Sequence, residues 1–171
     1  MAQTTSAMAA KQLRKLNDQR DALLAMERKA KTFTAAIQED EESVRPDYNY
    51  RATQETLIAL EAKIRKLKHS LNCFNSTYII PDFGMTIDQM LIYIPQLTAR
   101  KKKLDGMRGR LPKERARESL VRGNNFIEYS YANYDISETE ADYSAVSDEL
   151  ARAQMALDTA NATVHFEVDI D

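Results

Sequence analysis

The feature that most constrains this chain is an apolar stripe between residues 57 and 74. Its members lie three, four, three, four and three residues apart: Leu57, Leu60, Ile64, Leu67, Leu71 and Phe74. An average period of 3.5 residues keeps such a stripe on one side of a helix that supercoils with a partner helix. Burying six side chains of this kind contributes on the order of 10 kcal/mol gross, so the stripe needs a partner. It therefore predicts a helix over about residues 49–74 that packs in a core or an oligomer interface.

A weaker helical pattern precedes it, over about residues 9–33. Leu16, Leu23 and Ala30 share one heptad position, and Met26 and Phe33 share the partner position. A polar connector with an acidic run and a proline separates the two patterns, and the residue before a proline is biased away from helix. Two alternatives stay open: the stripe packs on this helix in an antiparallel hairpin, or on its own copy in an oligomer.

Two further helices are predicted over about residues 87–107 and 137–161. Thr86 with Gln89, and Ser137 with Glu140, have the spacing of capping boxes at their starts. A short helix is predicted over about residues 112–122, because Pro112 suits a first helical turn. The chain contains only four Gly and four Pro, which favours long helices over many short strands.

Alternation of apolar and polar residues predicts strands over about residues 125–134 and 163–170. Two lone strands are marginal in water, so we expect them to pair with each other and with copies in a neighbouring subunit, or to cover the end of the bundle. The predicted fold is mainly α, a long antiparallel coiled-coil hairpin or helical bundle with a small C-terminal β element. We treat residues 1–171 as a single elongated domain and expect a homo-oligomer.

Charge is strongly segregated along the second half of the chain. Residues 100–122 hold ten Lys or Arg against three acids, +7, whereas residues 123–171 hold one Arg against eleven acids, −10. Clustered basic side chains that are accessible can bind phosphates. The candidate polyanion contacts are Arg100, Lys101, Lys102, Lys103, Arg108, Arg110, Lys113, Arg115 and Arg117. The simpler interpretation is a helix exterior that pairs with the acidic last helix.

No residue pattern predicts a catalytic, metal or cofactor site. Cys73 is the only cysteine, and His69, four residues before it, has no third ligand nearby in sequence. The C-terminal carboxylates lack the spacing of a calcium loop. Tyr129, Tyr131, Tyr134 and Tyr143 suggest a stacking platform for bases, but they lie in the acidic segment, where a phosphate backbone would be repelled, so we expect all four to pack in the core. The sequence predicts a protein that is not an enzyme.

The N-terminal residues do not have the pattern of a signal peptide, and the chain has no run of about 18 apolar residues. We therefore expect a cytoplasmic protein.

The order of the segments resembles the septicolysin-like family of small helical bacterial proteins. The resemblance is carried by the segment "ALEAKIRKLKHSLNCFNST", the turn "FGMTIDQML" and the end "LDTANATVHFEVDID". The matching positions are Leu60, Ile64, Leu67, Leu71, Asn75, Gly84, Thr86, Leu91, Leu157, Asp158 and Thr163. The family name implies a cytolysin, and the family pattern offers no catalytic residue.

These observations predict a non-enzymatic, self-associating helical scaffold or interaction protein of the septicolysin-like type, with a possible protein partner. The alternative is a module that binds a polyanion, either nucleic acid or an anionic membrane surface, through residues 100–117. A membrane-lytic protein is the third hypothesis.

Overall fold

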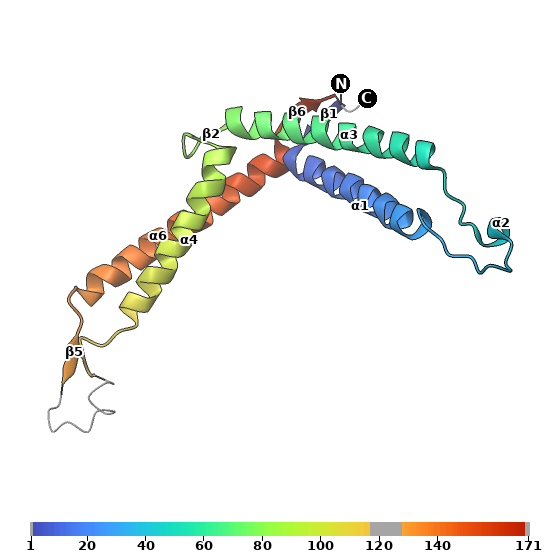
Figure 1. Ribbon diagram of the computed structural model, residues 1–171. Coiled ribbons are helices and arrows are strands. Elements are labelled where there is room, and N and C mark those ends of the chain that lie inside the picture. Colours follow the sequence, from blue (N-terminus) through green and yellow to red (C-terminus); the bar gives the residue numbers. More distant parts are fainter. Residues whose placement is uncertain (1, 117–127, 170–171) are drawn as a thin grey trace. The chain divides into compact units, whose positions relative to one another are not determined.

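The computed structural model describes residues 2–116 and 128–169, and the chain is mainly helical with small antiparallel strand pairs (Figure 1). The predicted fold class is therefore confirmed. The contacts divide the chain into two compact units, unit 1 with Met1–Tyr78 and Thr159–Asp171, and unit 2 with Ile79–Asp158. This division does not test whether the two units fold as one domain, so the single elongated domain stays a prediction.

Unit 1 is built on a helical hairpin. Helix α1 (Ser6–Ala30) and helix α3 (Tyr50–Thr77) lie side by side, and a connector containing the short helix α2 (Glu41–Val44) reverses the chain (Figure 1). The Thr5 side chain accepts a hydrogen bond from the backbone N–H of Met8, and Asn49 does the same for Ala52. Because Thr5 caps α1, this helix begins about three residues earlier than predicted. It also ends earlier, at Ala30 rather than at about residue 33.

The apolar stripe of α3 packs within its own chain. Leu67 is fully buried in a cluster with Ala9 of α1 and Val168 near the C-terminus. The ring of Phe74 stacks on that of Phe166, with centroids 4.6 Å apart. The other four members of the stripe, Leu57, Leu60, Ile64 and Leu71, are half-buried. The hairpin alternative thus accounts for the stripe, and self-association stays a prediction that needs another surface.

The two ends of the described chain form one small sheet. Strand β1 (Ala2–Thr5) pairs antiparallel with strand β6 (His165–Val168), with Ala2 opposite Val168 and Thr5 opposite His165. The predicted C-terminal strand is confirmed at residues 165–168, whereas its predicted partner was wrong. The segment "AQTT" has no apolar alternation, so its pairing follows from backbone hydrogen bonding that sequence periodicity does not reveal.

Unit 2 begins with a tight hairpin. Strands β2 (Ile79–Ile80) and β3 (Met85–Thr86) pair antiparallel, and Gly84 in the intervening turn has φ +61°, which favours glycine. Thr86 and Gln89 form the predicted capping box at the start of α4 (Ile87–Arg108), and Pro95 lies inside this helix. The predicted helix over residues 87–107 is therefore confirmed.

Helix α6 (Ile136–Thr163) runs antiparallel to α4, and its residues 136–158 belong to unit 2 (Figure 1). Tyr93 of α4 donates a hydrogen bond to Glu149 of α6, and Arg108 donates to Glu140. The buried apolar side chains of this hairpin are Ile87, Met90, Leu97 and Leu104 from α4, and Val146, Leu150, Ala153 and Leu157 from α6. These residues form the apolar interior of unit 2.

The segment "MLIYI", residues 90–94 of α4, is only partly buried. Met90 is fully buried, but Leu91 and Ile92 are 50% and 58% exposed. A helix buries one stripe, and two residues that follow a core position rotate about 100° and 200° away from it. An apolar run of five residues therefore cannot lie wholly inside a two-helix unit.

Two predictions for the segment between α4 and α6 were wrong, namely the helix over residues 112–122 and the capping box at Ser137. Residues 113–115 form strand β4 (Lys113–Arg115) rather than part of a helix over 112–122, because they pair antiparallel with strand β5 (Tyr129–Tyr131). Residues 117–122 of that helix, and residues 125–127 of the predicted strand, lie outside the described residues. Asp135 accepts hydrogen bonds from the backbone N–H and hydroxyl of Ser137, so Asp135 caps α6 in place of Ser137.

Candidate polyanion-binding surface

The predicted basic segment lies at one end of unit 2, on the last turns of α4, the following turn and β4. Leu97 and Leu104 point into the core, and Lys102 and Lys103, which lie between them in sequence, are exposed. The candidate contacts that the structure leaves exposed are Arg100, Lys102, Lys103, Arg110, Lys113 and Arg115. We call these six residues the basic end. Arg117 lies outside the described residues.

Two of the predicted contacts, Lys101 and Arg108, have structural roles. The guanidinium of Arg108 is 3.0 Å from both Asp105 and Glu140 and lies 3.8 Å from the centroid of the Tyr143 ring. The Lys101 ammonium lies 5.5 Å from the same ring. Hydrogen bonding to Asp105, and then to Glu140, raises the pKa of Arg108. The expected pairing between basic segment and acidic last helix thus holds at Arg108.

Strands β4 and β5 form a two-stranded ribbon with a distinct face. In the register, Lys113 lies opposite Tyr131 and Arg115 lies opposite Tyr129. Alternate residues of a strand share a face, so these four side chains lie on one face of the ribbon, and Glu114 and Ser130 lie on the other. The Lys113 ammonium is 4.1 Å and 5.4 Å from the centroids of Tyr129 and Tyr131. We call this the ribbon face.

The tyrosines divide into two pairs. Tyr129 and Tyr131 are 46% and 63% exposed, so the expectation that they pack in the core was wrong. Tyr134 and Tyr143 are half-buried, and the Tyr134 hydroxyl donates to the backbone carbonyl of Met107. The alternation "YSY" opposite "KER" was the sequence signal that could have identified the ribbon, but it needed the register to be recognised.

His69 and Cys73 are close but incomplete as a metal site. Cys73 Sγ lies 3.6 Å from His69 Nε2, and both side chains are exposed on α3. Within residues 2–116 and 128–169, no group of three or more His, Cys, Asp or Glu side chains could hold a metal ion. Zinc sites in proteins use three or four such ligands. The pair therefore gives no support to a metal centre.

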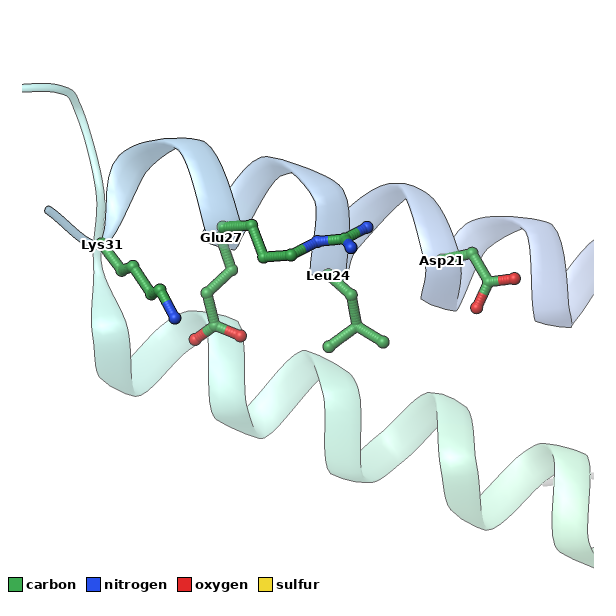
Figure 2. Close-up of a pocket in the computed structure, with 5 residues that line it drawn as sticks. Asp21, Leu24, Glu27 and Lys31 are labelled. Carbon is green, nitrogen blue, oxygen red and sulfur yellow. The ribbon is translucent and has the colours of Figure 1, made fainter.

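A hollow in unit 1 is lined by Asp21, Leu24, Glu27, Arg28 and Lys31. Figure 2 shows Leu24 and Glu27 of α1, and Lys31 directly after it, projecting toward the neighbouring helix. The Glu27 carboxylate accepts hydrogen bonds from the Tyr48 hydroxyl and the Gln54 amide, both at 2.7 Å. The bond to Glu27 raises the pKa of Tyr48 to about 12. Glu27 therefore links α1 to the connector and to α3, and the other acid of the hollow, Asp21, lies 2.8 Å from Arg20.

Comparisons with known proteins locate the fold and nothing further. No protein-family model matches the sequence, and no curated protein matches it. In the described part of the chain, none of the helices has the length and apolarity that crossing a membrane requires. A solved structure is similar over 97% of this chain and 100% of its own, with 16% identity and a TM-score of 0.59: the crystal structure of a functionally unknown conserved protein from Corynebacterium diphtheriae.

Proposed function

We propose that this protein is a non-enzymatic module that binds a phosphate-bearing polyanion through the basic end of unit 2. The observation that carries the proposal is the exposure of six of the nine predicted basic contacts. These cations lie within one compact unit, on the last turns of α4, on the turn that follows it and on β4. Exposed Lys and Arg that gather in one region bind polyanions by releasing the counterions that the polyanion carries.

The arrangement separates structural from available cations. Arg108 and Lys101 contact Tyr143, whereas Lys102 and Lys103 follow directly on α4 and are exposed. The ribbon places Lys113 and Arg115 on the same face of β4. The acidic residues that this unit uses internally, Glu140 and Glu149, are hydrogen-bonded to α4. Lys102 and Lys103 are therefore not used in these contacts between α4 and α6. Arg110 lies 3.9 Å from Glu114, and Lys113 lies over Tyr129 and Tyr131, but both side chains stay exposed.

The test measures fluorescence anisotropy of labelled polyphosphate at several salt concentrations. We expect affinity to fall steeply with salt, and the double variant Lys102→Gln, Lys103→Gln to bind more weakly with a shallower salt slope. The matched control, Lys63→Gln with Lys68→Gln, removes the same charge from exposed positions on α3. Equal loss in both double variants would contradict a localised site and leave only a general charge effect.

A second candidate is the self-associating scaffold predicted from the sequence. The stripe of α3 and both predicted strands have partners within the chain, so the observation that favours association is the exposure of Leu91 and Ile92 on α4. Exposed apolar side chains next to each other often mark contact surfaces. Light scattering at low and physiological salt measures the molar mass of the protein in solution. If the wild type is an oligomer, the double variant Leu91→Gln, Ile92→Gln should be a monomer. A monomeric wild type removes this candidate.

The septicolysin-like resemblance supports a third candidate, membrane lysis, and a dye-release assay on anionic vesicles tests it. Intact vesicles at saturating protein would exclude lysis. A cytoplasmic location also stays a proposal, and fractionation of the producing cells tests it.

A further inference from the structure

We infer that the ribbon face binds single-stranded nucleic acid, with Tyr129 and Tyr131 stacking on bases and Lys113 and Arg115 contacting phosphates. This inference rests on the proposed polyanion-binding function and adds the class of polyanion. All four side chains are exposed and belong to unit 2. The register of β4 and β5 places them on one face.

The ribbon arranges these side chains as two rows. Residues two apart in a strand lie about 7 Å from each other, and paired strands lie about 5 Å apart. One row holds the rings of Tyr129 and Tyr131, and the row beside it holds the cations of Lys113 and Arg115. An extended single strand likewise carries its bases along one side and its phosphates along the other. The two rows therefore match the two sides of the ligand.

Aromatic exposure is what distinguishes this face from an ordinary basic surface. Tyr131 is 63% exposed although tyrosine has a large apolar ring. Stacking of a base on an exposed aromatic ring is sequence-tolerant, because every base has a π face. The Lys113 ammonium lies over both rings, yet Tyr129 and Tyr131 stay 46% and 63% exposed. We expect a base to stack on this exposed ring surface and the Lys113 ammonium to contact a neighbouring phosphate.

The acids of the ribbon lie away from this face. Glu114 alternates with Lys113 and Arg115, and its carboxylate is 3.9 Å from Arg110. Alternation likewise places Glu128 on the face opposite to Tyr129. The ribbon thus sorts aromatic and cationic side chains onto one side and acids onto the other, which lets a phosphate approach.

Single-stranded nucleic acid is favoured over duplex and over lipid because stacking needs bases that are not already paired. A duplex presents phosphates and hides the faces of its bases. An anionic membrane presents phosphates without any π surface. Duplex nucleic acid and anionic membranes would still bind a surface that acts through charge alone. They therefore serve as the probes that distinguish base stacking from electrostatic attraction.

The experiment compares four probes by anisotropy or sedimentation at one salt concentration: a single-stranded oligonucleotide, its duplex, polyphosphate, and vesicles of phosphatidylcholine with anionic phosphatidylserine. We expect the single strand to bind most tightly. Tyr129→Leu and Tyr131→Leu should each weaken its binding by about fivefold or more, since stacking on one aromatic side chain is lost. Polyphosphate binding should stay unchanged in these variants.

Tyr129→Phe and Tyr131→Phe are the matched controls, since they keep the ring and remove only the hydroxyl, and they should bind like wild type. Leucine keeps an apolar side chain on the ribbon, and circular dichroism checks that each variant is folded. If leucine variants bind the single strand as wild type does while Lys102→Gln with Lys103→Gln weakens all probes, the inference is overturned and the proposed function stands. Tighter binding to duplex or vesicles overturns it too. Absence of binding to every probe removes both.

Discussion

The two helical hairpins of this chain are held together in different ways. The α1–α3 hairpin of unit 1 buries leucines and is closed by a sheet made from β1 and β6. The α4–α6 hairpin of unit 2 combines an aliphatic interior with cross-helix contacts of charged and aromatic side chains, such as Arg108 with Glu140 and Tyr143. Unit 1 also has exposed cations, such as Lys63 and Lys68. Unit 2 places exposed cations opposite exposed rings on one strand pair, and this is why the binding proposals concern unit 2.

The largest expected effect on stability comes from placing a charge in the apolar core of unit 1. Leu67→Asp places an unpaired carboxylate in a fully buried position and should destabilise unit 1 by about 4 kcal/mol or more. Ile58→Asp, at a 65% exposed position on the same helix, is the matched control and should have little effect. Urea denaturation measures the free energy of unfolding of each.

Amide hydrogen exchange then shows where the loss occurs. We expect Leu67→Asp to accelerate exchange in residues 6–30 and 50–77 and to leave residues 87–108 protected. Equal acceleration in both hairpins would contradict two separate units and support the single-domain prediction.

A cavity in unit 2 should have the next largest effect. Leu97→Ala removes a fully buried side chain from the α4–α6 interior, and we expect a loss of about 3 kcal/mol. Leu91→Ala, at a half-exposed position on α4, should cost much less. Thermal unfolding compares the two, and equal losses would mean that the apolar interior does not hold this hairpin together.

The charged contacts of unit 2 should contribute less, and their contribution should depend on salt. Glu140→Gln removes the carboxylate that accepts from Arg108, so we expect a small decrease in melting temperature at low salt that shrinks in 1 M salt. Arg108→Lys should also lose the planar contact with Tyr143. A decrease that salt does not change would contradict an electrostatic role for Glu140.

The smallest expected effect is the pH dependence of the unit 1 connector. The hydrogen bond to Glu27 raises the pKa of Tyr48 from 10.0 to about 12. Because the folded value is above the unfolded one, the stabilising contribution is complete below pH 10 and is lost as pH rises through 12. The difference in melting temperature between wild type and Tyr48→Phe should therefore narrow from pH 10 to pH 12. A constant difference would show that the bond contributes nothing.

The sequence revealed those parts of the fold that depend on periodicity. The stripe from Leu57 to Phe74 and the capping box at Thr86 predicted α3 and the start of α4, because local spacing and local hydrogen bonds decide both. The partner of β6 was missed because "AQTT" pairs through its backbone. The ribbon was missed because Pro112 suggested a helix, while the register that joins Lys113 to Tyr131 depends on residues far apart in sequence.

The position of the candidate basic surface in the chain could be predicted from the sequence, but the exposure of its side chains could not. A run of Lys and Arg is visible in any sequence, but exposure depends on which of them the fold uses. Arg108 and Lys103 are similar by sequence, yet one contacts two acids and a ring and the other is exposed. The tyrosines of β5 gained their proposed role only once their strand partner was known.

The pairing of Ala2 with Val168 has a consequence for how the chain is made. Val168 shares a buried cluster with Ala9 and Leu67, so the hairpin that leaves the ribosome first lacks one wall of its core until β6 has been synthesised. Contacts between such distant segments form slowly because a long loop must close first. During translation the part of the hairpin that β6 covers, around Ala9, Leu67 and Phe74, is therefore exposed to other chains and to chaperones. A ribosome that stalls before residue 165 yields a hairpin that cannot complete its core.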